Sequence, residues 1–334
     1  MAATTLCVGI ASFAHVHAPA YARALGEIAG ISLAGLWDDD PARGQRAAGD
    51  FGTRFYAQLN DLLAMVDTLI VAAENTRHKD LVIAAAAAGV HVLCEKPLAT
   101  TLADGQAMID ACAAAGVTLG TAFPVRYSES VRRLRAAVQN GALGETLVIR
   151  ATNRGTYPGG WFGDPALAGG GALMDHVVHV ADLLRWIWQR EFAEVYAEAA
   201  TRHHDLMVED CGLLLITLEG GTIASLDPSW SRPAQAFPTW GDVTMEVTGT
   251  AGVAYLDVFA QNVELFSNQR VRAQWLNWGD NLDRLMLEDW LRAIRSGAPA
   301  PISGEDGLRA LELALGAYRS AQTHTPVLFP LAEA

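Results

Sequence analysis

The sequence predicts two domains: an α/β domain with a doubly wound parallel sheet, followed by an α+β domain around a mostly antiparallel sheet. Short apolar runs alternate with helical stretches from residue 6 to residue 122, and this alternation is typical of a parallel sheet with helical crossovers. Beyond Arg126, strand-like runs follow one another with few helices between them. The change of pattern near residue 124 gives predicted domains of 1–124 and 125–334.

Five strands and four helices are expected in the first domain. Pro41 is well placed to open a helix, because the first turn has N–H groups without helical partners. Gly89 is the expected C-terminal glycine of another helix, and Thr101 can cap a third that runs to Gly116. The expected strands are 6–11, 31–37, 66–73, 90–94 and 118–122, and the expected helices are 17–28, 41–51, 79–88 and 102–116.

In the second domain, Glu219-Gly220-Gly221 separates two strand-like runs and is typical of a hairpin turn. Such a turn favours antiparallel pairing of the strands beside it. The expected strands are 146–152, 194–199, 212–218, 222–226, 243–248 and 253–258, and the expected helices are 130–139, 172–188, 281–296 and 305–322.

Composition excludes several classes of function. The chain has 334 residues, 51% of them hydrophobic, and a formal net charge of −13, so each domain can bury a core of its own. An acidic chain without a Lys/Arg cluster lacks the electrostatic signature of a nucleic-acid binder. The same charge makes an anionic membrane surface a poor partner, and no apolar run reaches the roughly 18 to 20 residues of a membrane helix.

The cysteines and the N-terminus favour a cytoplasmic protein. The four cysteines, Cys7, Cys94, Cys112 and Cys211, include no CxxC pair, and so few thiols in a long chain favour buried, reduced side chains over a disulfide framework. Residues 1–20 contain no Lys or Arg, so the charged region of a signal peptide is missing.

The segment after the first predicted strand is a candidate phosphate-binding loop. Ligands of an open parallel sheet bind at the carboxyl ends of its strands, and here the chain reads Gly9 to His17. Ser12-Phe13-Ala14 stand where a dinucleotide loop has its Gly-x-Gly. Small side chains keep most of the clearance, and the following helix offers N–H groups to an anion. His15 is a further candidate near a cofactor or substrate, although a strand-loop-helix start is common to many α/β proteins.

Asp38 strengthens the interpretation as a nucleotide site. It ends the second predicted strand, where a carboxylate can bind the hydroxyls of an adenosine ribose. Asp39 and Asp40 add negative charge that would repel a 2′-phosphate, so NAD is favoured over NADP. Arg43 is close enough to offset part of this charge. The alternative is that the acidic residues only cap the helix opened by Pro41, and both interpretations can hold for different carboxylates.

Two further segments carry candidate chemistry. Glu95-Lys96-Pro97 follows the fourth predicted strand, so Lys96 faces the ligand side of the sheet and can stabilise a developing alkoxide; the alternative is a surface turn. Within helix 172–188, Asp175 and His179 are four residues apart and therefore neighbours. A carboxylate beside an imidazole raises its basicity, as a general base requires; the alternative is a solvated face with an incidental pair.

Taken together, these segments resemble the glucose–fructose oxidoreductase/inositol dehydrogenase/rhizopine-catabolism (Gfo/Idh/MocA) family. The resemblance rests on the Gly9–His17 loop, Asp38, the run from Asn75 to His78, Glu95-Lys96-Pro97, and Gly169-Gly170-Gly171 leading into Asp175 and His179. It covers nearly the whole chain. It implies an N-terminal Rossmann domain and a C-terminal domain with a large open sheet, which the family often uses for dimer or tetramer contacts.

The resemblance also implies an NAD(P)-dependent oxidoreductase that acts on a secondary alcohol of a sugar, polyol or related compound. His179 would take the hydroxyl proton while hydride passes to the nicotinamide, Lys96 would hold the reacting oxygen, and Asp175 would orient the substrate or assist the proton relay. The implied cofactor contacts are Ser12, Phe13, Ala14, His15, Asp38, Asn75, Thr76, His78, Glu95, Lys96, Pro97 and Arg126.

The chain departs from the family pattern at the loop residues Ser12 and Ala14, at Pro124, where the family often has Asn, and at His176. Asp175, His176 and His179 have ligand types that suit a divalent metal, but the resemblance calls for none, so we expect no metal and treat His176 as a substrate contact. Trp161, Trp230 and Arg232 are further substrate candidates, because aromatic rings stack on sugars and Arg binds anionic groups; the alternative is core or interface.

Two alternative functions stay open at this point. Tightly bound NAD could be reduced and reoxidised in one cycle, giving net hydrolysis or isomerisation. The chain could also be a catalytically silent dinucleotide sensor, although a sensor has no need of Lys96, Asp175 and His179 together.

Overall fold

The computed structural model describes residues 5–269 and 273–332, and its internal contacts divide the chain into two units. The first unit ends at Pro124 and also contains Asn281–Leu308, whereas the second contains Val125–Asp280 and the residues from Arg309 onward. The predicted second domain, 125–334, instead includes 281–308. The difference arises from helix α9, whose Trp290 is buried and donates its indole N–H to Thr68 Oγ1 at 3.2 Å.

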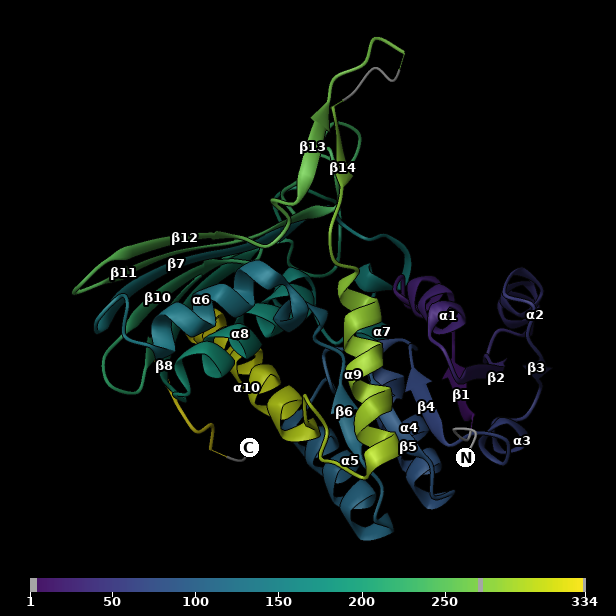
Figure 1. Ribbon diagram of the computed structural model, residues 1–334. Helices are drawn as coiled ribbons and strands as arrows, with labels where there is room; N and C mark the ends of the chain where they lie inside the picture. The colour runs from purple at the N-terminus through teal and green to yellow at the C-terminus, as the bar shows by residue number, and fades with distance from the viewer. Residues whose placement is uncertain (1–4, 270–272, 333–334) are drawn as a thin grey trace. The chain divides into compact units, whose positions relative to one another are not determined.

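The first unit contains a parallel sheet with the strand order β3-β2-β1-β4-β5-β6 (Figure 1). The chain leaves β1 toward β2 on one side and returns to β4 on the other, so the sheet is doubly wound, as predicted. The strands are β1 Leu6–Ala11, β2 Ile31–Trp37, β3 Phe55–Tyr56, β4 Thr68–Val71, β5 His91–Cys94 and β6 Leu119–Thr121. The order reverses between β1 and β4, where an open α/β sheet binds its ligands.

The helices of this unit follow the predicted positions to within a few residues. They are α1 Ala18–Glu27, α2 Pro41–Asp50, α3 Leu59–Leu63, α4 His78–Ala87, α5 Leu102–Ala115 and α9 Leu282–Ser296. Strand β3 and helix α3 were not predicted, because two and five residues are too short to show a period. Asp40 caps α2 and Thr101 caps α5 through their side chains, and Gly116 ends α5 with φ +66°.

The second unit contains a mixed sheet with the order β12-β11-β7-β10-β9-β8-β15. Its strand pairs are antiparallel except for β7 with β10, so the mostly antiparallel sheet is confirmed. The strands are β7 Thr146–Gly155, β8 Phe192–Ala200, β9 Cys211–Leu218, β10 Ile223–Asp227, β11 Gly241–Gly249, β12 Val253–Asp257 and β15 Val327–Leu328.

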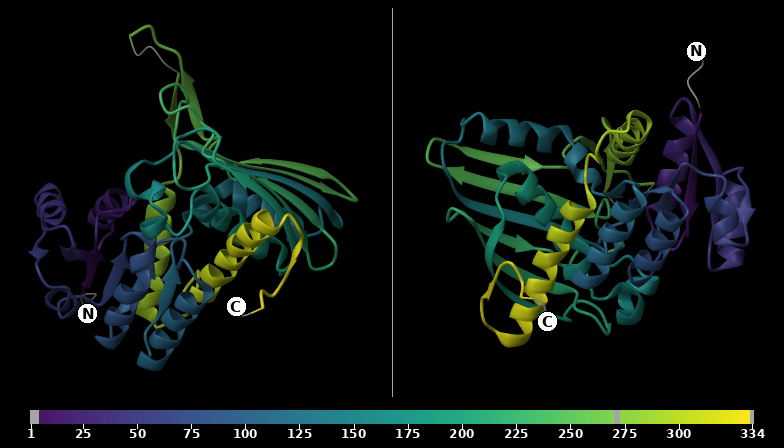
Figure 2. Two further views of the ribbon diagram at one scale, coloured as in Figure 1. Left: turned by 180° about the vertical axis from the view of Figure 1, so that it is seen from behind. Right: turned by 90° about the horizontal axis from the view of Figure 1, so that it is seen from below.

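Helices cover one face of this sheet (Figures 1 and 2). They are α6 Glu129–Gln139, α8 Val178–Trp188 and the part of α10 (Gly304–Thr323) that belongs to this unit, and the short α7 Pro165–Ala168 lies beside the glycine-rich segment. Strands β13 Asn262–Leu265 and β14 Gln274–Asn277 form a separate hairpin that projects from the sheet (Figure 1). The hairpin and β15 were not predicted. None of the described helices combines the length and apolar character needed to cross a membrane.

Candidate active site

The loop after β1 holds Ser12 in a conformation that favours glycine. Its φ is +72°, in the left-handed region that costs a residue with a Cβ about 1–2 kcal/mol. The Ser12 hydroxyl oxygen accepts a hydrogen bond from the Ala14 N–H at 3.2 Å and another from the Arg43 guanidinium at 3.2 Å. Ser12 therefore adopts a glycine-like turn and stabilises it with its side chain.

Asp38 organises the same loop from the end of β2. Its buried carboxylate accepts from the Phe13 N–H at 2.8 Å, from the Asp40 N–H at 2.9 Å, and from Arg43 at 2.7 and 2.9 Å. Asp40 makes the helix cap instead, accepting from Ala42 and Arg43 N–H groups. Helix capping thus belongs to Asp40, and Asp38 stays the candidate for the ribose hydroxyls. Arg43 was predicted only as a neighbour, and it forms a bidentate ion pair with Asp38.

Glu95, at the end of β5, is the centre of a buried polar cluster. Its carboxylate lies 3.0 Å from His17 Nδ1 and 3.5 Å from His15 Nδ1, and it accepts from the Tyr21 hydroxyl at 2.5 Å and from the Lys96 N–H at 3.0 Å. Lys96 itself is buried, and its peptide bond to the following proline is cis.

Opposite charges decide the protonation of this cluster. Burial alone would raise the pKa of Glu95, but the charges of His15 and His17, the His17 hydrogen bond and the charge of Lys96 hold it well below its usual range. Burial would lower the pKa of His17, yet its charge interaction and hydrogen bond with Glu95 raise it. Burial and the charge of Glu95 raise the pKa of Tyr21 well above 10. The cluster therefore favours a carboxylate with a protonated His17.

Within the described residues, His15, His17 and Glu95 also form the one group of side chains close enough to share a metal ion, with ligand atoms within 4.8 Å of one another. The Glu95 oxygen that faces both imidazoles already accepts the Tyr21 hydroxyl. Asp175, His176 and His179 do not make up such a group.

The predicted residues after β4 lie on a short helical turn. Asn75 and Thr76 belong to a 3₁₀ turn, Asn75–Arg77, and His78 begins α4. The buried His78 lies with Nδ1 3.0 Å from the Pro97 carbonyl oxygen, and burial lowers its pKa. His78 thus connects the end of β4 to the Lys96-Pro97 segment.

In the second unit, Glu209 and Tyr318 bind the glycine-rich segment. Glu209 accepts from the Gly171 N–H at 3.1 Å, from the Leu173 N–H at 2.9 Å and from the Tyr318 hydroxyl at 2.6 Å. A Cβ at Gly171 would lie 2.0 Å from the Glu209 carbonyl oxygen, so glycine is required there. Neither partner was predicted, because each is distant in sequence and nothing local marks it.

The helix that follows begins with a π-helical turn, Leu173–Val177, before α8. Asp175, His176 and His179 are all buried, so the alternative of a solvated face is wrong. The Asp175 carboxylate oxygen Oδ2 lies 3.3 Å from His176 Nε2 and accepts from the Trp230 indole N–H at 3.1 Å. Trp230 is a buried neighbour of Asp175.

The remaining predicted residues of this unit pair with other side chains. Arg126 forms a bidentate, buried ion pair with Asp182. Arg232 pairs with Asp242 and lies over the Phe237 ring. The half-buried Trp161 stacks on Phe162 at a ring-centroid distance of 4.0 Å.

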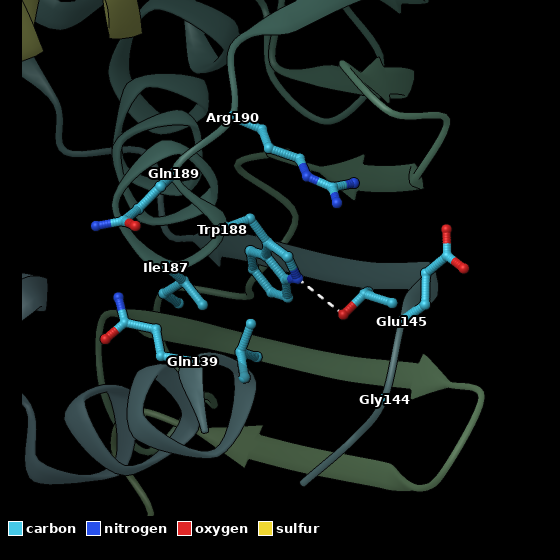
Figure 3. Close-up of a pocket in the computed structure, with 9 residues that line it drawn as sticks. Gln139, Gly144, Glu145, Ile187, Trp188, Gln189 and Arg190 are labelled. Carbon is cyan, nitrogen blue, oxygen red and sulfur yellow. Dashed lines mark hydrogen bonds between the residues drawn. The ribbon is translucent and has the colours of Figure 1, made fainter. Parts of the chain in front are cut away.

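A separate pocket of about 480 Å³ lies between the ends of α6 and α8 and the start of β7. Trp188 lines it and donates to Thr146 Oγ1 at 2.9 Å, the dashed line of Figure 3. None of the predicted site residues lines this pocket, so it is not the candidate active site.

Residues 4–123 match the oxidoreductase family with an NAD-binding Rossmann fold, and residues 131–255 match the GFO/IDH/MocA C-terminal domain. Myo-inositol 2-dehydrogenase of Thermotoga maritima is 29% identical over 77% of this chain and 78% of its own length. 1,5-Anhydro-D-fructose reductase of Ensifer adhaerens is 32% identical over 77% and 78%.

Among solved structures, GenD2 from gentamicin A biosynthesis in complex with NAD is 27% identical, with a TM-score of 0.89 over 98% of this chain and 97% of its own. The match extends through both units, so the likeness includes the glycine-rich segment and its helix as well as the nucleotide domain. The chain therefore belongs to the Gfo/Idh/MocA family and is a nicotinamide-dependent oxidoreductase.

Proposed function

We propose that this enzyme oxidises a secondary hydroxyl of a sugar, a polyol or a related compound, or reduces the corresponding ketone, with Lys96, Asp175 and His179 as its catalytic residues. The observation that carries the proposal is that a family oxidoreductase keeps all three ionisable side chains, each of them buried. Relatives named as inositol, apiose and anhydrofructose enzymes support a sugar-like substrate.

The roles follow from the chemistry of the groups. His179 accepts the hydroxyl proton as the C–H bond breaks and the C=O bond forms, and it returns that proton in the reverse direction. Lys96 donates hydrogen bonds to the reacting oxygen and stabilises the negative charge that develops there. Asp175 orients the substrate. Bound NAD supplies the hydride acceptor at its nicotinamide ring.

The residues of the first unit fit such a dinucleotide. The left-handed Ser12 and the small Ala14 give the loop between β1 and α1 a glycine-like course, and the positive end of the α1 dipole follows this loop. Asp38 suits the ribose hydroxyls. All of the residues named from the sequence as cofactor contacts therefore stay part of this proposal.

We propose NAD as the preferred cofactor. Asp38 and Asp39 both carry negative charge where a 2′-phosphate would lie, and both already engage Arg43. Replacing Asp38 by Ser would remove one carboxylate and release Arg43 from its bidentate pair. We therefore expect Asp38→Ser to raise the ratio of NADP to NAD turnover, with Asp104→Ser, which removes a partly exposed carboxylate of α5, as the control.

The test of the central proposal is turnover across a panel of sugars, polyols and sugar acids, followed by the absorbance of reduced nicotinamide. Lys96→Ala and His179→Ala should abolish turnover while NAD binding persists. Lys79→Ala and His203→Ala, which change a surface lysine and an exposed histidine, are the matched controls. Full activity in either catalytic variant would contradict its assigned role.

Hydride recycling and a catalytically silent sensor are the two alternatives. Neither is favoured, because the relatives carry the names of dehydrogenases and reductases. Hydride recycling would become the favoured function if NAD stayed bound through purification and no compound of the panel were a substrate.

We also propose that the enzyme assembles as a homodimer or homotetramer through the open face of its seven-stranded sheet. That face carries exposed Leu213, Leu215, Ile223, Val253 and Tyr255, and apolar surface of this kind marks an interface. The occupant we assign is a second copy of the chain, because symmetric self-association pairs such a face with itself.

A further inference from the structure

The imidazole of His176 is placed between two hydrogen-bond acceptors. Its Nδ1 lies 2.9 Å from the carbonyl oxygen of Pro228, and its Nε2 lies 3.3 Å from Oδ2 of Asp175. Both His176 and Asp175 are buried. The ring therefore joins the loop after β10 to the carboxylate on its own helix.

These two contacts determine how many protons the ring holds. A carbonyl oxygen can only accept, so Nδ1 carries a hydrogen. In a neutral imidazole the other nitrogen would then present a lone pair to the carboxylate, and two acceptors would face each other inside the protein. One additional proton between Nε2 and Oδ2 removes this conflict.

That proton resides on the imidazole. An unperturbed carboxyl group has a pKa of about 3.9 and an unperturbed imidazole one of about 6.5, so the nitrogen is the stronger base. Oδ2 also accepts the Trp230 indole N–H at 3.1 Å, and a second donor to the same oxygen favours the ionised carboxylate.

The surroundings hold the ring in this place. The Asn153 side chain donates to the His176 backbone carbonyl at 3.0 Å, and a Cβ at Gly155 would approach the ring carbon Cε1 to 2.8 Å. The Trp230 and Trp240 rings lie 6.5 and 6.2 Å from the imidazole. The groups that Asn153, Trp230 and Trp240 bring near the ring are neutral, whereas Asp175 brings a carboxylate.

We propose that His176 is a positioning residue that carries a positive charge at neutral pH and keeps Asp175 ionised and oriented. This inference rests on the catalytic role proposed for Asp175. When His176 loses its proton, its Nε2 lone pair faces the Asp175 carboxylate, and the carboxylate must turn away. While His176 keeps its proton, His179, four residues beyond Asp175 on the same helix, follows a neutral ion pair rather than an isolated negative charge.

Two other histidines, the buried His78 and the half-buried His17, show why the carboxylate matters. Both ring nitrogens of His78 face carbonyl oxygens, and burial lowers its pKa. His17 faces the carboxylate of Glu95, and although burial opposes it, the charge of Glu95 raises its pKa. His176, like His17, faces a carboxylate.

The direct test is nitrogen NMR of the full-length protein labelled with ¹⁵N-histidine. The chain has nine histidines, and the signals missing from His176→Gln identify His176. We expect both of its ring nitrogens to show imidazolium shifts at about pH 7, where an unperturbed imidazole is mostly neutral. An unprotonated, pyridine-type nitrogen at that pH would overturn the proposal.

Two matched variants test the positioning role. The amide of His176→Gln can place an N–H near the position of Nε2 and donate to Asp175 without titrating, whereas the amide of His176→Asn reaches only the position of Nδ1. We expect His176→Asn to lose about ten- to a hundredfold in kcat, the cost of one hydrogen bond to a charged group. His176→Gln should keep most of kcat and lose the inflection of the pH–rate profile that belongs to His176. Equal losses in both variants, with unchanged profiles, would contradict the positioning role.

The NMR experiment and the turnover panel can fail independently, so together they separate this inference from the proposed function. One outcome is that His176 shows imidazolium signals but the enzyme turns over no compound of the sugar-like panel. The charged state of His176 would then stand, and the proposed substrate class would be wrong. Turnover that requires His179, combined with a neutral His176, would support the proposed function and overturn the inference.

Discussion

Ser12 shows how one side chain compensates for an unfavourable backbone conformation. Its positive φ would suit glycine, and its hydroxyl accepts from the Ala14 N–H and from Arg43. Strain and hydrogen bonding therefore oppose each other at one residue, and substitution can separate the two.

We expect Ser12→Gly to be more stable than Ser12→Ala by about 1 kcal/mol, because both variants lose the hydroxyl contacts and alanine alone keeps the backbone strain. Urea denaturation of both variants measures the difference. Arg46, exposed on α2, is the control, since Ala should exceed Gly there by about 1 kcal/mol. The same order at both positions would contradict the strain at Ser12.

The pair of His17 and Glu95 makes stability depend on pH. Because the pKa of His17 in the folded protein is raised, the stability it contributes is complete below its unfolded value of about 6.5 and is lost as pH rises through the folded value. The difference in unfolding free energy between wild type and His17→Ala should therefore shrink as pH rises above about 6.5, the unfolded pKa of histidine. Denaturation at a series of pH values tests this. The exposed His203→Ala should show a smaller and flatter difference.

At the scale of elements, the helix with Asp175 and His179 receives its N-terminal hydrogen bonds from outside itself. Its first N–H groups donate to the Glu209 carboxylate and to the Tyr318 hydroxyl. A helix end needs such acceptors, and these come from residues far along the chain.

Glu209→Ala should destabilise the protein by about 1–3 kcal/mol, because it leaves buried N–H groups without their acceptor. Glu209→Gln keeps one carbonyl oxygen for those groups and should lose less. Differential scanning calorimetry compares the two. Glu198 accepts from Tyr196 on the exposed side of β8, so Glu198→Ala is the matched control. A similar loss in both alanine variants would argue against the capping role.

At the scale of the whole molecule, the open sheet face decides assembly. Leu215 is 52% exposed in the middle of that face, and Met65, in the first unit, is 54% exposed. We expect Leu215→Glu to shift the protein toward monomer in sedimentation velocity, because the charge would have to be buried in the interface. Met65→Glu should leave the assembly unchanged. An oligomer that survives Leu215→Glu would place the interface elsewhere.

Much of the fold could be predicted because its signals are local. Strand β1 and its loop, Pro41 at the start of α2 and Gly116 at the end of α5 follow from apolar period, proline geometry and glycine freedom. The candidate residues Lys96, Asp175 and His179 were also named from short motifs. Their chemistry depends on residue type and on nearby spacing, and a sequence shows both.

Other features were decided only by the tertiary structure. Asp182 pairs with Arg126 across 56 residues, and Tyr318 reaches Gly171 across 147. Helix α9 belongs with the first unit although it follows the second in the chain. The sequence by itself determined the elements, the family motifs and the class of chemistry, because these depend on local period and residue type. The partners of each buried charge depend on contacts between distant segments, so only the folded chain determines them.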